Sequence, residues 1–131
     1  MLLIRFVIER AQQPFVFWAT PGGGVEEGET DLAAARRELL EELRLDIPLF
    51  GPVHTVTSTF EFEGKPLTST DVFFLGRHKS QDVALYFETE VERVAMKELR
   101  WWTIKELEQA PETVFPNDLA KVLRRLVEQR I

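Results

Sequence analysis

The sequence predicts a mixed fold of the α/β (α+β) class, and three observations lead to it. Short segments rich in β-branched and aromatic residues, such as 2–8 and 15–19, have the composition of strands. Segments with apolar residues at helical spacing, such as the one that follows Thr30, lie between strands. No repeat, low-complexity tract or linker interrupts the 131 residues, so we expect a single domain over 1–131.

The first half of the chain is predicted to hold two strands, a loop and a helix. Residues 2–8 and 15–19 form the strands, and a polar, turn-like segment separates them. The glycines at 22–24 form a loop, because glycine adopts backbone angles that other residues avoid. The helix that follows has Thr30 or Asp31 as its N-cap and alanines, which favour helix, in its first turns.

The second half alternates turn residues with strand-like and helical segments. A continuous apolar run at residues 72–75 suits a central strand. We predict, in order, a loop at 46–52, a strand at 53–62, a turn at 64–66, a strand at 68–76, a surface connection at 78–86, a strand at 99–104, a helix at 105–109 and a last helix capped by Asn117 or Asp118.

Composition and charge narrow the function classes. The net charge of −6 argues against general affinity for nucleic-acid backbones, which leaves open only a local basic pocket. The chain has no cysteine, so disulfides and thiolate metal sites are excluded. It has neither an apolar run of membrane-spanning length nor a leader-like start, so we expect a cytoplasmic protein without a membrane partner.

An acidic cluster follows the glycine loop. Glu38, Glu41 and Glu42 share one side of the predicted helix, and Arg37 is the obvious local countercharge. A solvated acidic face and a divalent-cation site explain this charge pattern about equally well. The glycine loop favours the cation site, because a backbone carbonyl can approach there and Mg²⁺ takes oxygen ligands and bridges to substrate phosphates.

Residues 23–45 resemble the Nudix box, G-x5-E-x7-R-E-U-x-E-E-x-G-U, where U is a bulky aliphatic residue. Arg44 stands where the box has its last glycine; this departure removes no carboxylate, so we expect it to affect stability at the helix C-terminus. The fixed positions in register are Gly23, Glu29, Arg37, Glu38, Leu39, Glu41, Glu42 and Leu45.

The resemblance implies a Nudix fold, a mixed β-sheet sandwiched between helices. It also implies Mg²⁺-dependent hydrolysis, with Mn²⁺ as a substitute, of a diphosphate that links a nucleoside to another moiety. The substrate is then a small nucleotide-type molecule. The implied metal ligands are Glu38, Glu41, Glu42 and the Gly23 carbonyl, and the implied residues that orient them are Glu29 and Arg37.

The base that activates water is either a box glutamate, Glu38 or Glu41, or a carboxylate of a later loop, as in different family members. Of the loop candidates Glu88, Glu90 and Glu92, we favour Glu92, although a solvated surface glutamate explains it at least as well. Arg5 is a further candidate, because a guanidinium can bind a phosphate, and a surface ion pair is an equally good explanation for it. Three aromatic residues could stack on a base, although aromatic residues in strands more often belong to the core: Phe60, Phe62 and Trp102.

Two other functions stay open: a nucleotide-binding regulatory module without turnover, and an RNA 5′-end pyrophosphohydrolase. Similar small domains also carry a strand ahead of the segment that matches residues 2–7, which would leave an uncovered sheet edge here. Either the true start lies upstream, or a second copy covers the edge, unless Arg5 and Arg10 keep it solvated. Of these we expect a homodimer.

Overall fold

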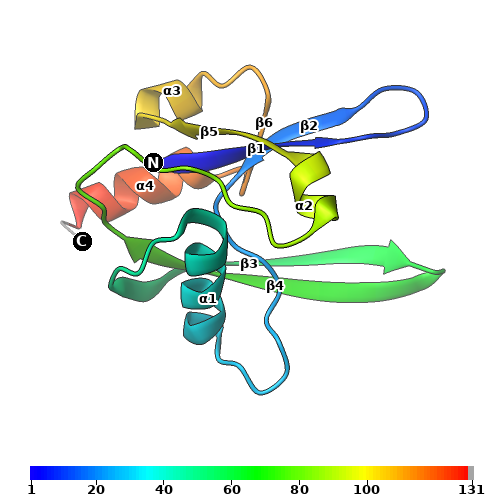
Figure 1. The fold of residues 1–131 in the computed structure, drawn as a ribbon, viewed down its shortest axis with the longest axis horizontal. Helices are drawn as coiled ribbons and strands as arrows, with labels where there is room; N and C mark the ends of the chain where they lie inside the picture. The colour runs from blue at the N-terminus through cyan, green and yellow to red at the C-terminus, as the bar shows by residue number, and fades with distance from the viewer. Residues whose placement is uncertain (130–131) are drawn as a thin grey trace.

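The computed structural model describes residues 1–129, apart from the side chain of Phe62, and confirms the mixed α+β class. In Figure 1, β1, β2 and β5 lie side by side, and the long β3–β4 hairpin runs next to α1. The elements of the described chain are β1 (Leu2–Ile8), β2 (Phe15–Ala19), α1 (Asp31–Leu43), β3 (Leu49–Phe62), β4 (Lys65–Gly76), α2 (Glu90–Ala95), β5 (Met96–Trp101), α3 (Ile104–Glu108), β6 (Thr113–Phe115) and α4 (Leu119–Glu128).

The larger sheet is mixed, with strand order β5-β1-β2-β6. Strand β1 is antiparallel to both of its neighbours, so that Ile4 pairs with Ala19 on one side and Leu99 on the other. Strand β6 runs parallel to β2. The expectation of an uncovered edge beside residues 2–7 is therefore wrong, because β1 is an interior strand, and the stated reason for expecting a dimer does not hold.

The main core lies on one face of this sheet. Side chains alternate between the two faces along a strand, which puts Leu3 and Trp18 on the same face. There they pack with Trp102 and with Leu107 and Leu119 of α3 and α4. The Trp18 and Trp102 rings meet edge to face, with centroids 5.0 Å apart.

Strand β5 lies earlier than predicted, at Met96–Trp101 rather than 99–104. Trp102 falls outside the strand, and its main-chain N–H donates to the Met1 carbonyl at 2.7 Å. The strand stops there because Thr103 caps α3, through a reciprocal pair of hydrogen bonds with Glu106.

The β3–β4 hairpin is longer than predicted. Its turn is Glu63–Gly64, with φ of 52° and 76°, so Lys65 already belongs to β4. Strand β3 begins at Leu49, within the loop predicted at 46–52. The pairing with β4 shifts between Phe50 and His54, and this irregularity accommodates a glycine and a proline that a regular central strand would disfavour.

Two short elements were not predicted. Helix α2 has six residues and starts with a capping box between Thr89 and Glu92, a pattern visible in the sequence. Strand β6 has three residues, and its pairing with β2 depends on tertiary contacts rather than on local sequence. None of the helices formed by residues 1–129 is long and apolar enough to span a membrane.

Helix α1 begins and ends at the residues the sequence singled out. Thr30 is the N-cap, and its side chain accepts a hydrogen bond from the Ala33 N–H at 3.1 Å. Arg44 is the C-cap, with φ 56° and ψ 34°. This left-handed conformation costs a non-glycine residue about 1 kcal/mol, so the backbone strain expected at Arg44 is present.

Candidate active site

The acidic side of α1 is packed into the protein. Glu42 is only 3% exposed, as is Leu43 of the apolar side, whereas Leu32 and Leu40 are 41% and 48% exposed. The side chains of Glu38 and Glu41 are 13% and 35% exposed. The interpretation as a solvated acidic face is therefore wrong for Glu42 and Glu38, whereas Glu41 is partly exposed.

The glycine loop lies directly against these carboxylates. The Gly22 N–H donates to Glu42 Oε1 at 2.9 Å, and Gly22 itself has φ 152°. A Cβ atom at Gly23 would come within 2.6 Å of the carboxyl carbon of Glu38. A larger residue at position 23 would therefore displace the Glu38 carboxylate from its present place.

Arg37 connects this loop to α1. Its guanidinium donates to both oxygens of Glu29, with Nε–Oε2 at 2.7 Å and Nη2–Oε1 at 3.0 Å, and also to the Gly24 carbonyl at 2.9 Å. Glu29 in addition accepts the Glu26 N–H at 3.0 Å. Arg37, and to a lesser extent this N–H, lower the pKa of Glu29 to about 2. The pair is therefore fully charged at neutral pH.

Arg37 also contacts two of the clustered glutamates. Its Nη1 donates to Glu38 Oε1 at 2.8 Å and to Glu41 Oε2 at 3.3 Å. The bonds to Glu29 first, and then the bond to Glu38, raise the pKa of Arg37. The structure thus brings Glu29, Arg37, Glu38 and Glu41 into one hydrogen-bonded group.

Glu42 has no such partner. Among residues 1–129 no basic side chain lies within ion-pair distance of it, and burial, reinforced by the charges of Glu38, Glu92 and Glu41, raises its pKa to about 8. A buried carboxylate without a countercharge is unfavourable unless a cation accompanies it.

The donor set suits a hard divalent cation. Glu38, Glu41, Glu42 and the backbone carbonyls of the glycine loop offer only oxygen ligands, as Mg²⁺ prefers. In the described part of the chain, no three acidic or histidine side chains already form a cation site. Glu38 and Glu41 accept hydrogen bonds from Arg37.

Glu92 lies beside this cluster, but on a helix rather than in the predicted loop. Its charge contributes to the raised pKa of Glu42. Its Oε1 accepts the N–H groups of Glu88 and Thr89, at 2.8 and 3.1 Å, and so caps α2. The other two loop candidates are elsewhere engaged: Glu88 pairs with Arg44 and Glu90 with Arg93.

Arg5 forms an ion pair, as its alternative interpretation predicted. It donates to Glu112 through Nε at 3.0 Å and Nη2 at 2.9 Å, and Trp18 Nε1 donates to the same carboxylate at 3.0 Å. These bonds lower the pKa of Glu112. The guanidinium of Arg5 is therefore already occupied, on the face of the sheet that carries the core.

Of the three candidate aromatic residues, the side chain of Phe62 lies outside the described part of the chain, and the other two differ in exposure. Trp102 is 4% exposed and lies in the core, with the Arg100 guanidinium carbon 3.9 Å from its ring centre. It offers no free face to a substrate, so the assignment of Trp102 to substrate binding is wrong. Phe60 is 49% exposed and pairs with Leu67, two residues before the end of β3.

Sequence reasoning missed an aromatic cluster on the opposite face of the sheet from the core. The Phe6 and Phe17 rings stack at 5.1 Å, and Phe115 meets Phe17 edge to face at 5.4 Å. Phe115 pairs with Ala19, at the end of β2 from which the glycine loop leaves, and is 40% exposed. The phenylalanines at every second position of β2 were the available signal.

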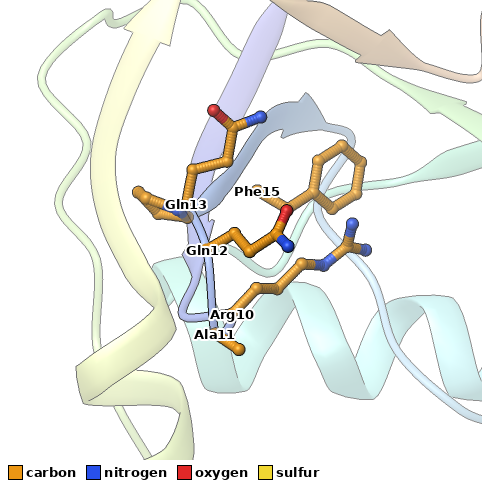
Figure 2. A pocket seen from close by; sticks show the side chains of 6 residues that line it. Arg10, Ala11, Gln12, Gln13 and Phe15 are labelled. Carbon is orange, nitrogen blue, oxygen red and sulfur yellow. The ribbon is translucent and has the colours of Figure 1, made fainter.

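A shallow hollow of about 400 Å³ lies at the β1–β2 turn, away from the glutamates. Figure 2 shows that consecutive residues of this turn line it, with the Arg10 guanidinium beside the Phe15 ring, 4.4 Å from its centre. No acidic residue takes part. The hollow is a surface feature of the turn and separate from the acidic cluster.

Solved structures of similar fold come from several organisms. The MutT protein from Methanosarcina mazei Go1 has a TM-score of 0.65 at 20% identity, over 98% of this chain and 83% of that one. A C. elegans Ap4A hydrolase binary complex has a TM-score of 0.63 at 18% identity, over 98% of this chain and 85% of that one. The E. coli ORF135 protein has a TM-score of 0.57 at 24% identity, over 98% of this chain and 82% of that one. At these identities the likeness shows the fold alone.

Comparison with protein families is more decisive. A search of curated protein sequences gave no significant match. The family model of the NUDIX domain, however, matches residues 2–126, which include the whole acidic cluster and its glycine loop. This protein therefore belongs to the Nudix family and is a Nudix-type hydrolase that acts on phosphoric anhydrides.

Proposed function

We propose that the protein is a Mg²⁺-dependent pyrophosphohydrolase that cleaves the diphosphate linking a nucleoside to another moiety, with Mn²⁺ as a substitute for Mg²⁺. The observation that carries this proposal is Glu42, a buried carboxylate without a basic partner among the described residues, next to the glycine loop. A cation at this position would compensate its charge. An anionic diphosphate would then be drawn to the same place.

Four groups of the chain would hold the ion: the carboxylates of Glu38, Glu41 and Glu42, and the carbonyl of Gly23. Bound there, Mg²⁺ would neutralise phosphate oxygens and lower the pKa of a coordinated water. Arg37 orients Glu38 and Glu41 through the contacts at 2.8 and 3.3 Å. Glu29 in turn fixes Arg37, and such supporting contacts commonly affect metal affinity.

The proton of the attacking water would pass to a box glutamate. Glu41 is the most exposed of the clustered glutamates, and its contact with Arg37 is longer than that of Glu38. We therefore assign proton transfer to Glu41, with Glu38 as the next candidate. Glu92 is less suited, because one of its oxygens already accepts two backbone N–H groups.

The nucleoside end of the substrate would lie near Phe115. This side chain is exposed and lies beside the strand end that leads into the glycine loop, so a base stacked on it would be near a diphosphate held at the glutamates. Phe60 is a second exposed aromatic residue, on the hairpin.

A substrate panel tests this function. Nucleoside triphosphates, nucleotide sugars, dinucleoside polyphosphates and RNA with a 5′ phosphate would be assayed with Mg²⁺, for wild type, Glu42→Gln and the control Glu27→Gln. Glu27 is an exposed glutamate of the same loop. We expect turnover of at least one small nucleotide, loss of most of it in Glu42→Gln, and wild-type rates in Glu27→Gln. Binding without turnover would instead indicate a regulatory module, and turnover of RNA alone an RNA-end enzyme.

A further inference from the structure

Arg44 is the residue that departs from the box, and its side chain contacts another part of the chain. Its guanidinium carbon lies 4.9 Å from the ring centre of Tyr86, and its Nη2 lies 3.9 Å from Glu88 Oε1. Both partners belong to residues 77–89, which we call the 77–89 connection. A glycine at position 44 would satisfy the left-handed backbone without strain but would make neither contact.

The 77–89 connection is also attached near its end, where the N–H groups of Glu88 and Thr89 donate to Glu92 and the Arg93 guanidinium lies over the Phe87 ring. It contains no regular helix or strand and runs from the end of β4 to α2 (Figure 1). The Tyr86 N–H donates to the Glu42 carbonyl at 2.8 Å, and Trp101 Nε1 donates to the Gln81 carbonyl at 3.1 Å. The contacts of Arg44 and the Tyr86 N–H bond are those that join this segment to the end of α1, so their loss should loosen it locally.

One of these anchors is made to the candidate active site itself. The Glu42 whose main chain accepts the Tyr86 N–H is the buried member of the acidic cluster. The connection leads directly into α2, where Glu92 lies close enough for its charge to act on Glu42. The position of the 77–89 connection therefore affects both the main chain and the electrostatic surroundings of Glu42.

We propose that Arg44 is a positioning residue that holds the 77–89 connection against the end of α1 and thereby keeps Glu42 in its cation-binding arrangement. The inference rests on the proposed function for its catalytic consequence, but not for the contact itself. Arg44 exchanges the unstrained backbone of a glycine for a cationic side chain that stacks on Tyr86 and faces Glu88. The departure from the box thus has a role beyond helix stability.

Three variants separate positioning from stability. Arg44→Gly removes both the side chain and the strain, Arg44→Ala removes the side chain alone, and Arg36→Ala is the control. Arg36 is an exposed arginine of the same helix whose contact is with Asp46, outside the connection. The measurements are amide hydrogen exchange of residues 77–89, Mg²⁺ affinity by calorimetry, and melting temperature.

In metal-free protein, the amide hydrogens of residues 77–89 should exchange about three- to fivefold faster in both Arg44 variants than in wild type. This is the size expected for loss of a partly exposed cation–π contact and ion pair. Both should also bind Mg²⁺ about threefold more weakly. Arg44→Gly should melt higher than Arg44→Ala, because only glycine relieves the strain. Arg36→Ala should leave both the exchange and the affinity unchanged.

Tyr86→Leu supplies the matching change on the other side of the contact. If the two residues act together, the double variant Arg44→Gly with Tyr86→Leu should show an amide exchange rate no higher than that of the faster single variant. Wild-type exchange in both Arg44 variants would overturn the proposal, and so would additive effects in the double variant. Failure of wild type to bind Mg²⁺ or hydrolyse any substrate would instead count against the proposed function, since the exchange experiment needs neither.

Discussion

The amide of Gly22 donates a 2.9 Å hydrogen bond to the carboxylate of Glu42, which is 3% exposed. This bond joins the glycine loop to the acidic side of α1 and gives the buried carboxylate its hydrogen-bond partner from the main chain. It stabilises the charged form only in part, because burial still raises the pKa of Glu42 to about 8. The surroundings of Glu42 therefore favour either its neutral, protonated form or the binding of a cation to its carboxylate.

Glu42→Gln should raise the stability of the metal-free protein. The folded-state pKa of about 8 exceeds the unfolded value of about 4.3, so the wild type loses stability as the pH rises between these values. Glutamine keeps the acceptor for Gly22 and carries no charge. At pH 7 in EDTA we expect a gain on the order of 1–3 kcal/mol in urea unfolding, shrinking towards pH 4. Equal stability of the two proteins at every pH would contradict the account of Glu42.

Gly23→Ala should damage the site while Gly24→Ala should not. A Cβ atom at position 23 meets the Glu38 carboxylate at 2.6 Å, whereas one at position 24 meets nothing within 4 Å. Because positioning errors of about 1 Å cost on the order of a hundredfold in rate, we expect a loss of about that size for Gly23→Ala. The comparison is kcat on the best panel substrate, and similar rates for the two variants would show that the loop does not need to approach Glu38.

Glu112→Gln should lower stability at neutral pH and lose this effect in acid. The pKa of Glu112 is lowered by Arg5 and Trp18, so its contribution is present above the unfolded pKa of about 4.3 and is lost as the pH falls through the folded value. The carboxylate is partly exposed, so the expected loss at pH 7 is roughly 1 kcal/mol. Glu9→Gln, at an exposed position of the same sheet region, serves as the control. A constant difference between pH 7 and pH 3 would exclude this pair as the cause.

Trp102→Ala and Phe115→Ala should separate core packing from substrate binding. Trp102 is 4% exposed in the core, so its loss should destabilise the protein by about 3–5 kcal/mol. Phe115 is 40% exposed, so its loss should affect stability less and raise KM up to about tenfold, as for loss of an aromatic stacking contact. An unchanged KM in Phe115→Ala would remove this residue from the substrate site.

Local patterns predicted much of this fold. The strands at 2–8 and 15–19 and the N-cap at Thr30 followed from composition, turn residues and helical spacing, which act over a few positions. The contact of Gly23 with Glu38 agrees with the spacing of the box, because the loop and α1 are adjacent in the chain.

Other features depend on residues far apart in sequence. Arg5 and Glu112 are 107 positions apart, and no local pattern shows that they pair. The three residues of β6 form a strand because β2 is beside them. The depth to which Glu42 is buried was not predicted, because amphipathic spacing identifies the two sides of α1 but not how far each is shielded from solvent.

The central claim is that Glu42 and its neighbours bind a divalent cation needed for hydrolysis. Its most direct test is a calorimetric titration of Mg²⁺ into EDTA-stripped wild type and Glu42→Gln, at pH 8. We expect saturable binding to wild type and at least tenfold weaker binding to Glu42→Gln, as for loss of one charged ligand. Equal affinity in the two proteins, or no binding to wild type at millimolar Mg²⁺, would contradict the account.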